Sequence, residues 1–410
     1  MKSSIFVFGT DLIDEGYATV LHNLKDRAGV DAVSLSATYH NARDIFPHNP
    51  RSHVYKHEGD VAWFQPQRDN FRSGLVPTTA QESKSEDVLA RLCVEAERLG
   101  MPVNAWTIFL HNSRLGREHP DCTTRNIYGD AYVTDLCPAN PRVQDYAREL
   151  CEDITRYPVA SILAESLHYR PFEHGLHHER YLLDIPLTMR NYLSLCFCKY
   201  CTAAASDSGV DVETLGTELR TQLDQLWLDE PSQTGTSPLP LGNELQTKLD
   251  AYMDVRERTV TNLISDARGV AAAHGVEFTF IDHGGAMPHV MRGTTADDSI
   301  TVLSRKLGVN VREAASVSDE LSILGYVDTP DRLERKITAY RDTVSPVTPF
   351  SVVLRPLIPD SEDADNFSAK VRVVKKSGAV ALHIYHYALM PLRRLDWIRT
   401  ALTQDAGPQS

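Results

Sequence analysis

The chain has 410 residues, of which 55 are acidic and 42 basic, and a formal charge of -13 at pH 7. Hydrophobic residues make up 42% and charged residues 24%, a balance that is typical of a globular protein with a sizeable core and that excludes a disordered chain. The acidic charge, without a basic stripe interleaved with aromatic residues, argues against a nucleic-acid partner.

The sequence also lacks the pattern of a membrane or secretory segment. The apolar run at residues 5–8 is too short for the core of a signal peptide, and no run approaches the roughly 20 apolar residues of a membrane span. We therefore expect a cytoplasmic protein with no membrane partner. Seven cysteines in such a chain indicate free thiols or a metal site rather than a disulfide framework.

The first part of the chain alternates short apolar runs, rich in β-branched and aromatic residues, with segments of helical period. The predicted strands are residues 5–8, 32–38, 103–110 and 159–169. Helices are predicted over residues 17–27 and over residues 141–156. A third is predicted between them, from an N-cap at Ser85 to Gly100. Asn140 and Pro141 fit the N-cap and the first position of the last of these helices.

A helical insertion follows the fourth strand, at about residues 181–273, and its stretch at 233–241 is typical of a linker. The alternation then resumes. Further strands are predicted at residues 278–281, 309–311, 350–354 and 380–385. Further helices are predicted at residues 297–307, 330–343, 365–376 and 392–402, and a disordered tail at 403–410.

Eight strand-then-helix units in series predict an α/β fold with an all-parallel sheet covered on both sides. The count of eight favours a single (β/α)8 TIM barrel over residues 1–402, with long βα loops and the insertion after strand four. An open doubly wound sheet is the alternative. No G-x-G-x-x-G follows the first strand, so no nucleotide cofactor is expected.

In a (β/α)8 barrel the active site lies where the strands end. Glu165 ends the fourth predicted strand after an apolar run, where partial burial is expected to raise its carboxyl pKa and suit it to acid/base catalysis. Glycoside hydrolysis needs a second carboxylate, for which Asp282 is the first candidate and Glu313 the second. The plainer interpretation of each acid is an ion pair with an arginine such as Arg312 or Arg355.

Other predicted strand ends and loops carry side chains that suit the hydroxyl groups of a sugar. The candidate substrate-binding residues are Tyr39, His40, His111, His168, His174, His177, His178, His283, Arg355, His383, Tyr385 and His386. The histidines at 168–178 also allow a metal site or a solvated loop, but no H-E-x-x-H pattern is present. We therefore favour a sugar-binding role and a small-molecule carbohydrate as the substrate.

The C-x-C-x-x-C motif at Cys196, Cys198 and Cys201 indicates a metal site, because thiolates this close can share one tetrahedral Zn²⁺. The candidates for the fourth ligand are Cys137 and, after it, Cys122. A site made of four cysteines has no open position, so the expected zinc is structural. A reduced cluster without metal is the alternative.

Three features together resemble glycoside hydrolase family 42, the zinc-containing β-galactosidases with a clan A (β/α)8 barrel. They are C-P-A-N-P at 137–141, Glu165, and C-F-C-K-Y-C at 196–201. The resemblance implies Glu165 as the acid/base and Cys137, Cys196, Cys198 and Cys201 as zinc ligands. The chain departs from the family pattern at Ala164, where Asn is expected, and at Arg355, where the family has a nucleophilic Glu.

The leading hypothesis is a glycoside hydrolase-like enzyme that cleaves a small saccharide or glycoside. A second hypothesis is a divalent-metal sugar isomerase, epimerase or lyase, with Glu165, Asp282, His283, Glu313 and a strand-eight histidine as ligands. A third is a sugar-binding barrel without catalysis. A homo-oligomer is compatible with the sequence, which does not define the oligomeric state.

Overall fold

The computed structural model describes residues 1–174, 180–183, 185–228, 242–291, 293–295 and 298–404. The predicted linker at 233–241 and the tail residues 405–410 lie outside these ranges; Thr403, predicted to begin the tail, is the last residue of the final helix. Within them, no helix is both long and apolar enough to cross a bilayer.

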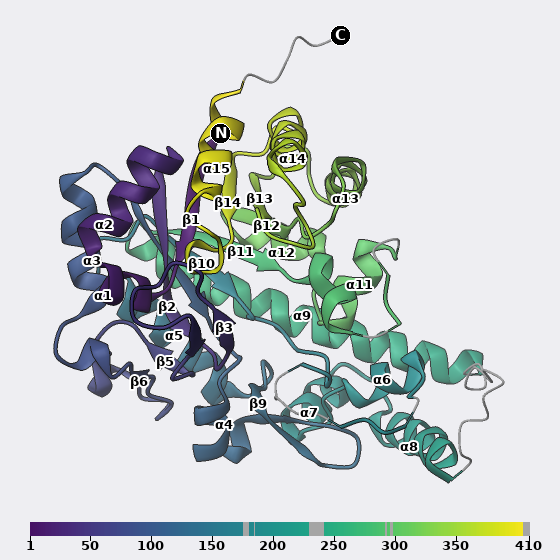
Figure 1. The fold of residues 1–410 in the computed structure, drawn as a ribbon. Helices are drawn as coiled ribbons and strands as arrows, with labels where there is room; N and C mark the ends of the chain where they lie inside the picture. The colour runs from purple at the N-terminus through teal and green to yellow at the C-terminus, as the bar shows by residue number, and fades with distance from the viewer. Residues whose placement is uncertain (175–179, 184, 229–241, 292, 296–297, 405–410) are drawn as a thin grey trace.

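Eight parallel strands close into a barrel, as predicted (Figure 1). They are β1 (Lys2–Val7), β2 (Ala32–Tyr39), β7 (Val103–Ile108), β10 (Ser161–Glu165), β11 (Glu277–Asp282), β12 (Glu320–Leu324), β13 (Phe350–Leu354) and β14 (Ala381–Ile384). The first strand pairs with both β2 and β14, which closes the sheet and excludes the open doubly wound alternative.

Helices cover the outside of the barrel, and their caps follow the sequence signals. They are α1 (Gly9–Glu15), α2 (Tyr17–His22), α3 (Val88–Arg98), α5 (Pro141–Ile154), α11 (Ile300–Lys306), α12 (Val311–Val317), α13 (Pro330–Thr343), α14 (Ala364–Lys376) and α15 (Arg394–Thr403). Asn140 caps α5 as predicted, because its side chain accepts from the backbone N–H of Arg142. The cap of α3 is Asp87 rather than the predicted Ser85.

The connections after the strands contain shorter elements. The loop strands are β3 (Arg43–Ile45), β4 (Val54–Lys56), β5 (Val61–Ala62), β6 (Thr78–Thr79), β8 (Thr123–Arg125) and β9 (Ala131–Leu136). The short helices are α4 (Ser113–Glu118), α10 (Met287–Val290), the π-helix η1 (Asn23–Ala28) and the 3-10 turns η2 (Arg68–Asn70), η3 (Glu82–Lys84), η4 (Pro120–Cys122), η5 (Gly284–Ala286) and η6 (Tyr387–Leu389).

Among the described residues, four helices lie between β10 and β11, where the insertion was predicted. They are α6 (Leu187–Leu193), α7 (Lys199–Asp207), α8 (Val212–Leu228) and α9 (Asn243–Ala273). The long α9 has two roles, since it contacts α7 and α8 in the insertion and α5, α12 and β11 in the barrel. Its buried residues Val260, Ile264 and Ala271 therefore place it in the helix layer of the barrel, which the sequence had assigned wholly to the insertion.

The sixth strand lies elsewhere than predicted. Residues 309–311 lead into α12, because Asn310 caps that helix by accepting from the backbone N–H of Glu313. The strand is instead β12, at Glu320–Leu324, which begins nine residues after the end of the predicted strand. This shift changes which side chains strand six contributes to the barrel.

The interior of the barrel has an aromatic upper part and a polar lower part. Phe6, Trp106 and Leu163 belong to a buried cluster separate from the main core between strands and helices. Below them, Ser4 Oγ lies 2.8 Å from both Ser34 Oγ and His383 Nδ1. The polar layer forms the closed lower end, so the other end, where the strands finish, is the one available for a site.

Candidate active site and metal centre

Glu165 is the last residue of β10 and points into the barrel. Alternation along the strand sets this direction, because Leu163, two residues earlier, packs in the interior cluster. The next residue, Ser166, has φ +55° and so turns the chain away from the strand direction. The Glu165 side chain keeps 19% of its surface exposed, so it is accessible at the barrel mouth.

Two side chains from neighbouring strands hold the Glu165 carboxylate. Trp106 Nε1 on β7 donates to Oε2 at 2.5 Å, and His283 Nε2, just after β11, lies 3.3 Å from Oε1. Burial opposes the charge, but His283 and Trp106 outweigh it and lower the pKa of Glu165 below its usual value. The expected rise in this pKa is therefore wrong, because the sequence did not show the two partners.

Tyrosines and an arginine form another part of the mouth. The hydroxyls of Tyr39 and Tyr385 lie 3.3 Å apart. The Arg355 guanidinium lies 3.8 Å from the ring centroid of Tyr326 and binds both carboxylate oxygens of Asp360. Aromatic faces and hydroxyls in this arrangement suit the apolar faces and hydroxyl groups of a sugar ring.

Five of the predicted histidines, which are His40, His111, His168, His174 and His283, form a cluster beside Glu165. Two others, His177 and His178, lie outside the described residues. The rings of His40 and His111 stack with centroids 4.6 Å apart, and those of His111 and His174 are 5.5 Å apart. The His168 ring is 4.9 Å from that of His283. Burial lowers the pKa of His40, His111 and His168, so these rings are neutral at pH 7 and can both donate and accept hydrogen bonds.

The structure does not bring Asp282 to Glu165. Its neighbour Ile281 faces the barrel interior, so Asp282 faces outward and is fully buried among the helices. Ser304 Oγ and Tyr340 Oη donate to its Oδ2 at 2.8 and 2.6 Å. Asp282 is thus a structural acid that fastens α11 and α13 to the barrel, which corrects the predicted catalytic pair.

Two further predicted residues, Glu313 and His383, are also remote from the mouth. Glu313 is exposed on α12, because residues 309–311 are not a strand. His383 lies in the lower polar layer, with its Nε2 3.6 Å from Glu320 Oε1. His386 lies beside the mouth residue Trp106, with ring centroids 5.9 Å apart, but it is fully buried and stacks on Phe8, with ring centroids 3.8 Å apart.

Sequence reasoning missed three mouth residues. Trp106 lies inside the third predicted strand, where alternation with Ile108 would have directed it inward. Tyr326 lies two residues after β12, and it was missed because the sixth strand was predicted at residues 309–311. Arg170 is buried, with its Nε 3.0 Å from Asp135 Oδ1 and its Nη1 donating to Ser166 Oγ at 3.0 Å. No signal in the sequence pointed to Arg170, because its partner lies in a distant loop.

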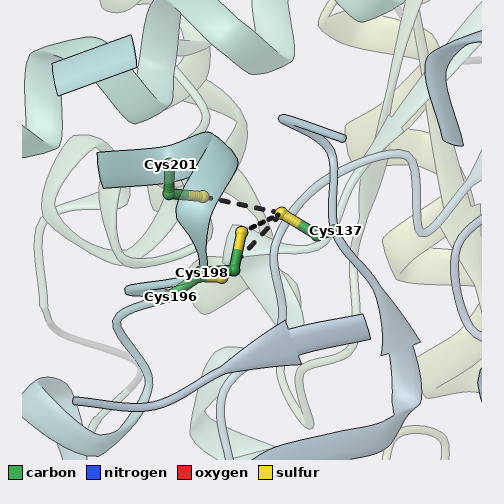
Figure 2. A group of neighbouring side chains, drawn as sticks. All are labelled: Cys137, Cys196, Cys198 and Cys201. Atoms are coloured by element: carbon green, nitrogen blue, oxygen red, sulfur yellow. Dashed lines mark hydrogen bonds between the residues drawn. The ribbon is translucent and has the colours of Figure 1, made fainter. Parts of the chain in front are cut away.

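The four cysteines of the predicted metal site meet in one buried cluster (Figure 2). Cys137 Sγ lies 3.8 Å from Cys196 Sγ and 3.5 Å from the sulfurs of Cys198 and Cys201. Four ligands at about 2.3 Å from one tetrahedral ion stand roughly 3.8 Å apart, so the thiols fit such an ion. Cys122 is outside the cluster and only its carbonyl contacts Cys137, which leaves Cys137 as the fourth cysteine.

The cysteine cluster ties the insertion to the segment that follows Glu165. The backbone N–H of Arg125 lies 3.3 Å from Cys196 Sγ, and Tyr169 Oη lies 3.3 Å from Cys201 Sγ. Tyr169 is four residues beyond Glu165. The cluster therefore anchors the chain just after the strand end, while remaining separate from the Glu165 carboxylate.

A second metal site at the mouth finds no support in the described ranges, where the four cysteines are the one group placed to hold an ion. The ligand set of the predicted isomerase is dispersed: Asp282 faces the helices, Glu313 is exposed on α12, and His383 lies in the lower layer. In the described residues, the Glu165 carboxylate is thus surrounded by hydrogen-bond donors rather than by further carboxylates.

Eight parallel strands that close on themselves, with helices around them, define the class of (β/α)8 TIM barrels. The chain is similar in structure to α-L-fucosidase isoenzyme 2 from Paenibacillus thiaminolyticus, with a TM-score of 0.56 and 12% identity, covering 98% of this chain and 49% of that one. It is similar to a β-galactosidase from the psychrophilic Marinomonas ef1, with a TM-score of 0.54 and 10% identity over 94% of this chain and 54% of that one.

The catalytic domain of a β-amylase from Paenibacillus polymyxa is also similar, with a TM-score of 0.52 and 10% identity over 97% of this chain and 94% of that one. The chain thus spans about half the length of the fucosidase and the galactosidase. At these identities the likeness establishes the fold alone. No protein-family model and no curated protein sequence matches the chain.

Proposed function

We propose that the protein is a glycoside hydrolase-like enzyme that cleaves a small saccharide or glycoside at the barrel mouth, with Glu165 as its catalytic carboxylate. The observation that most directly supports this proposal is the position of Glu165. Its side chain points inward at the end of β10, is partly exposed, and is held by Trp106 and His283. The glycosidase fold of the neighbours supports the reaction class.

The lowered pKa of Glu165 suits a base or nucleophile, because the side chain is ionised at neutral pH in the free protein. An imidazole is the natural proton donor to a leaving oxygen, and His283 is the one that lies against the carboxylate. Tyr39, Tyr326 and Tyr385 supply ring faces and hydroxyls for the sugar. The proposal thus gives the second catalytic role to His283, since Asp282 is turned away.

The test is a panel of aryl glycosides with the unmodified protein and the variant Glu165→Gln, which keeps the size of the side chain but removes its charge. We expect Glu165→Gln to lower kcat by at least about 100-fold on any glycoside that the protein cleaves, the order of effect typical of a positioned acid/base group. The matched control is Glu313→Gln, on the exposed face of α12. Equal turnover by the two variants would contradict the role of Glu165.

A sugar-binding barrel without catalysis is the second candidate. The observation that favours it is Arg355, which directly follows β13, where the resembled family has its nucleophile, and which is bound by Asp360. In this case no glycoside on the panel is hydrolysed by any form, while calorimetry still detects saccharide binding that Tyr385→Phe weakens.

We further propose that Cys137, Cys196, Cys198 and Cys201 hold a structural zinc ion. Burial raises the pKa of the Cys137 thiol, so a bound cation would favour its thiolate form. A zinc ion with four sulfur ligands contributes folding free energy and has no position open to substrate. Its chemistry would therefore be confined to holding the segment after β10 to the insertion.

A further inference from the structure

A cavity of about 310 Å³ lies between the insertion and the helix layer of the barrel. Its walls come from α6 and the turn after it, from α9, and from α11, three helices that lie on the same side of the barrel in Figure 1. No residue of the barrel mouth described above lines it. The cavity is therefore separate from Glu165, and its volume is at the lower end of the range for small-molecule sites.

One part of the cavity wall is apolar. The apolar lining residues include Tyr192, Leu195, Leu249, Met253, Met291 and Val302. Val302 is 53% exposed and stands at the solvent side, whereas Met291 and Leu195 are buried. This wall suits a hydrocarbon or aromatic body rather than a sugar.

The polar part of the wall contains a buried cation without a counter-charge. Arg256 is 2% exposed, and no carboxylate of the described residues forms an ion pair with it. Its Nη1 donates to the thioether of Met253 at 3.2 Å and its Nη2 to the carbonyl of Lys306 at 3.3 Å, while Nε has no partner. A guanidinium has five N–H donors, and a charge this buried is costly unless an anion pairs with it.

A second lining cation, Lys306, is also without a carboxylate partner in the part of the chain described, and burial lowers its pKa. Arg305, in contrast, is neutralised by Asp254 at 2.8 Å and Glu257 at 3.0 Å. Asp250 is the one carboxylate in the lining, and it lies 3.9 Å from Arg305. An excess of positive charge thus faces this cavity in a chain whose net charge is -13.

We propose that the cavity is a second ligand site, which binds a small amphipathic anion with an apolar body and one carboxylate. The apolar body packs on Leu249, Met291 and Val302. The carboxylate pairs with Arg256 and Lys306 and supplies the counter-charge that the fold lacks there. Arg256 also lies 4.3 Å from the ring centroid of Tyr169, whose hydroxyl lies 3.3 Å from Cys201 Sγ, so the competing role for Arg256 is to balance the charge of the thiolate cluster.

The experiment measures binding of decanoate and of decanol, which lacks the charge, to the full chain by isothermal titration calorimetry. We expect decanoate to bind at one site per chain and decanol at least about ten-fold more weakly. In Arg256→Gln we expect the affinity for decanoate to fall at least about ten-fold, while the affinity for decanol is unchanged. Arg258→Gln is the matched control, because Arg258 is on the same helix but exposed.

Two further variants keep the proposal testable if Arg256→Gln does not fold. Lys306→Gln changes a half-buried residue and is expected to weaken the binding of decanoate but not that of decanol. Val302→Trp fills the solvent side of the cavity and is expected to abolish binding of both compounds. The proposal is overturned if decanoate does not saturate, if decanol binds equally well, or if the two cation variants bind decanoate like the unmodified protein. The last result would assign Arg256 to the thiolate cluster alone.

Discussion

Trp106→Phe tests whether the environment of Glu165 sets its charge. The substitution keeps an aromatic ring against Phe6 but removes the N–H that Trp106 donates to Glu165 Oε2. A hydrogen bond to a charged group is worth about 1.5–3 kcal/mol, and about 1.36 kcal/mol corresponds to one pKa unit. Because the carboxylate keeps 19% exposure and water replaces part of the bond, we expect the Glu165 pKa to rise by roughly one unit.

The direct assay is an NMR pH titration of the protein labelled with carbon-13 at its glutamate carboxyls, with Glu165→Gln to assign the signal. Trp227→Phe is the control, because Trp227 donates to Tyr128 on the exposed surface. The reasoning fails if the Glu165 pKa in Trp106→Phe is unchanged or falls. That result would leave His283 and His40 as the causes of the lowered pKa.

Stability gives an independent measure with a defined sign. The folded-state pKa of Glu165 is lowered, so its contribution is present above the unfolded pKa of about 4.3 and is lost as the pH falls through the folded value. Trp106→Phe brings the two values closer. Its cost in unfolding free energy is therefore expected to be larger at pH 7 than at pH 3, and urea denaturation at both pH values measures it.

Two further predictions concern the structural groups. Cys137→Ser should lose the bound metal, measured by elemental analysis, and unfold at a lower temperature, whereas Cys122→Ser should keep the metal because Cys122 is outside the cluster. Tyr340→Phe removes a bond to the buried carboxylate of Asp282 and should cost about 1.5–3 kcal/mol in urea denaturation. It should leave kcat unchanged; a loss of kcat at unchanged stability would restore Asp282 to catalysis.

Much of the fold was predictable because seven of the eight strands are apolar runs with clear ends. The sixth was missed because 309–311 is as apolar as a short strand, and the deciding feature was Asn310, whose side chain caps a helix. The role of α9 was missed for a different reason. A helix of 31 residues can belong to two layers at once, and hydrophobic period alone does not separate them.

The candidate site was predictable to the extent that it depends on strand ends. Glu165 and His283 follow directly from the position of β10 and β11, and the cysteine cluster follows from its spacing. Asp282 was misjudged because one residue of register separates the barrel interior from the helix layer. The lowered pKa of Glu165 depends on Trp106, 59 residues away, a contact that only the folded chain reveals.

Arg355 clarifies why Glu165 remains available at the mouth. An unpaired arginine after β13 would be drawn to a nearby carboxylate, and Glu165 is near enough for both it and Arg355 to shift the pKa of Tyr326. Asp360 prevents this pairing by binding the guanidinium with both oxygens, and Tyr326 covers its face. Among the described residues, Glu165 is thus left with Trp106 and His283 as its partners and with no arginine ion pair, as the catalytic role proposed above requires.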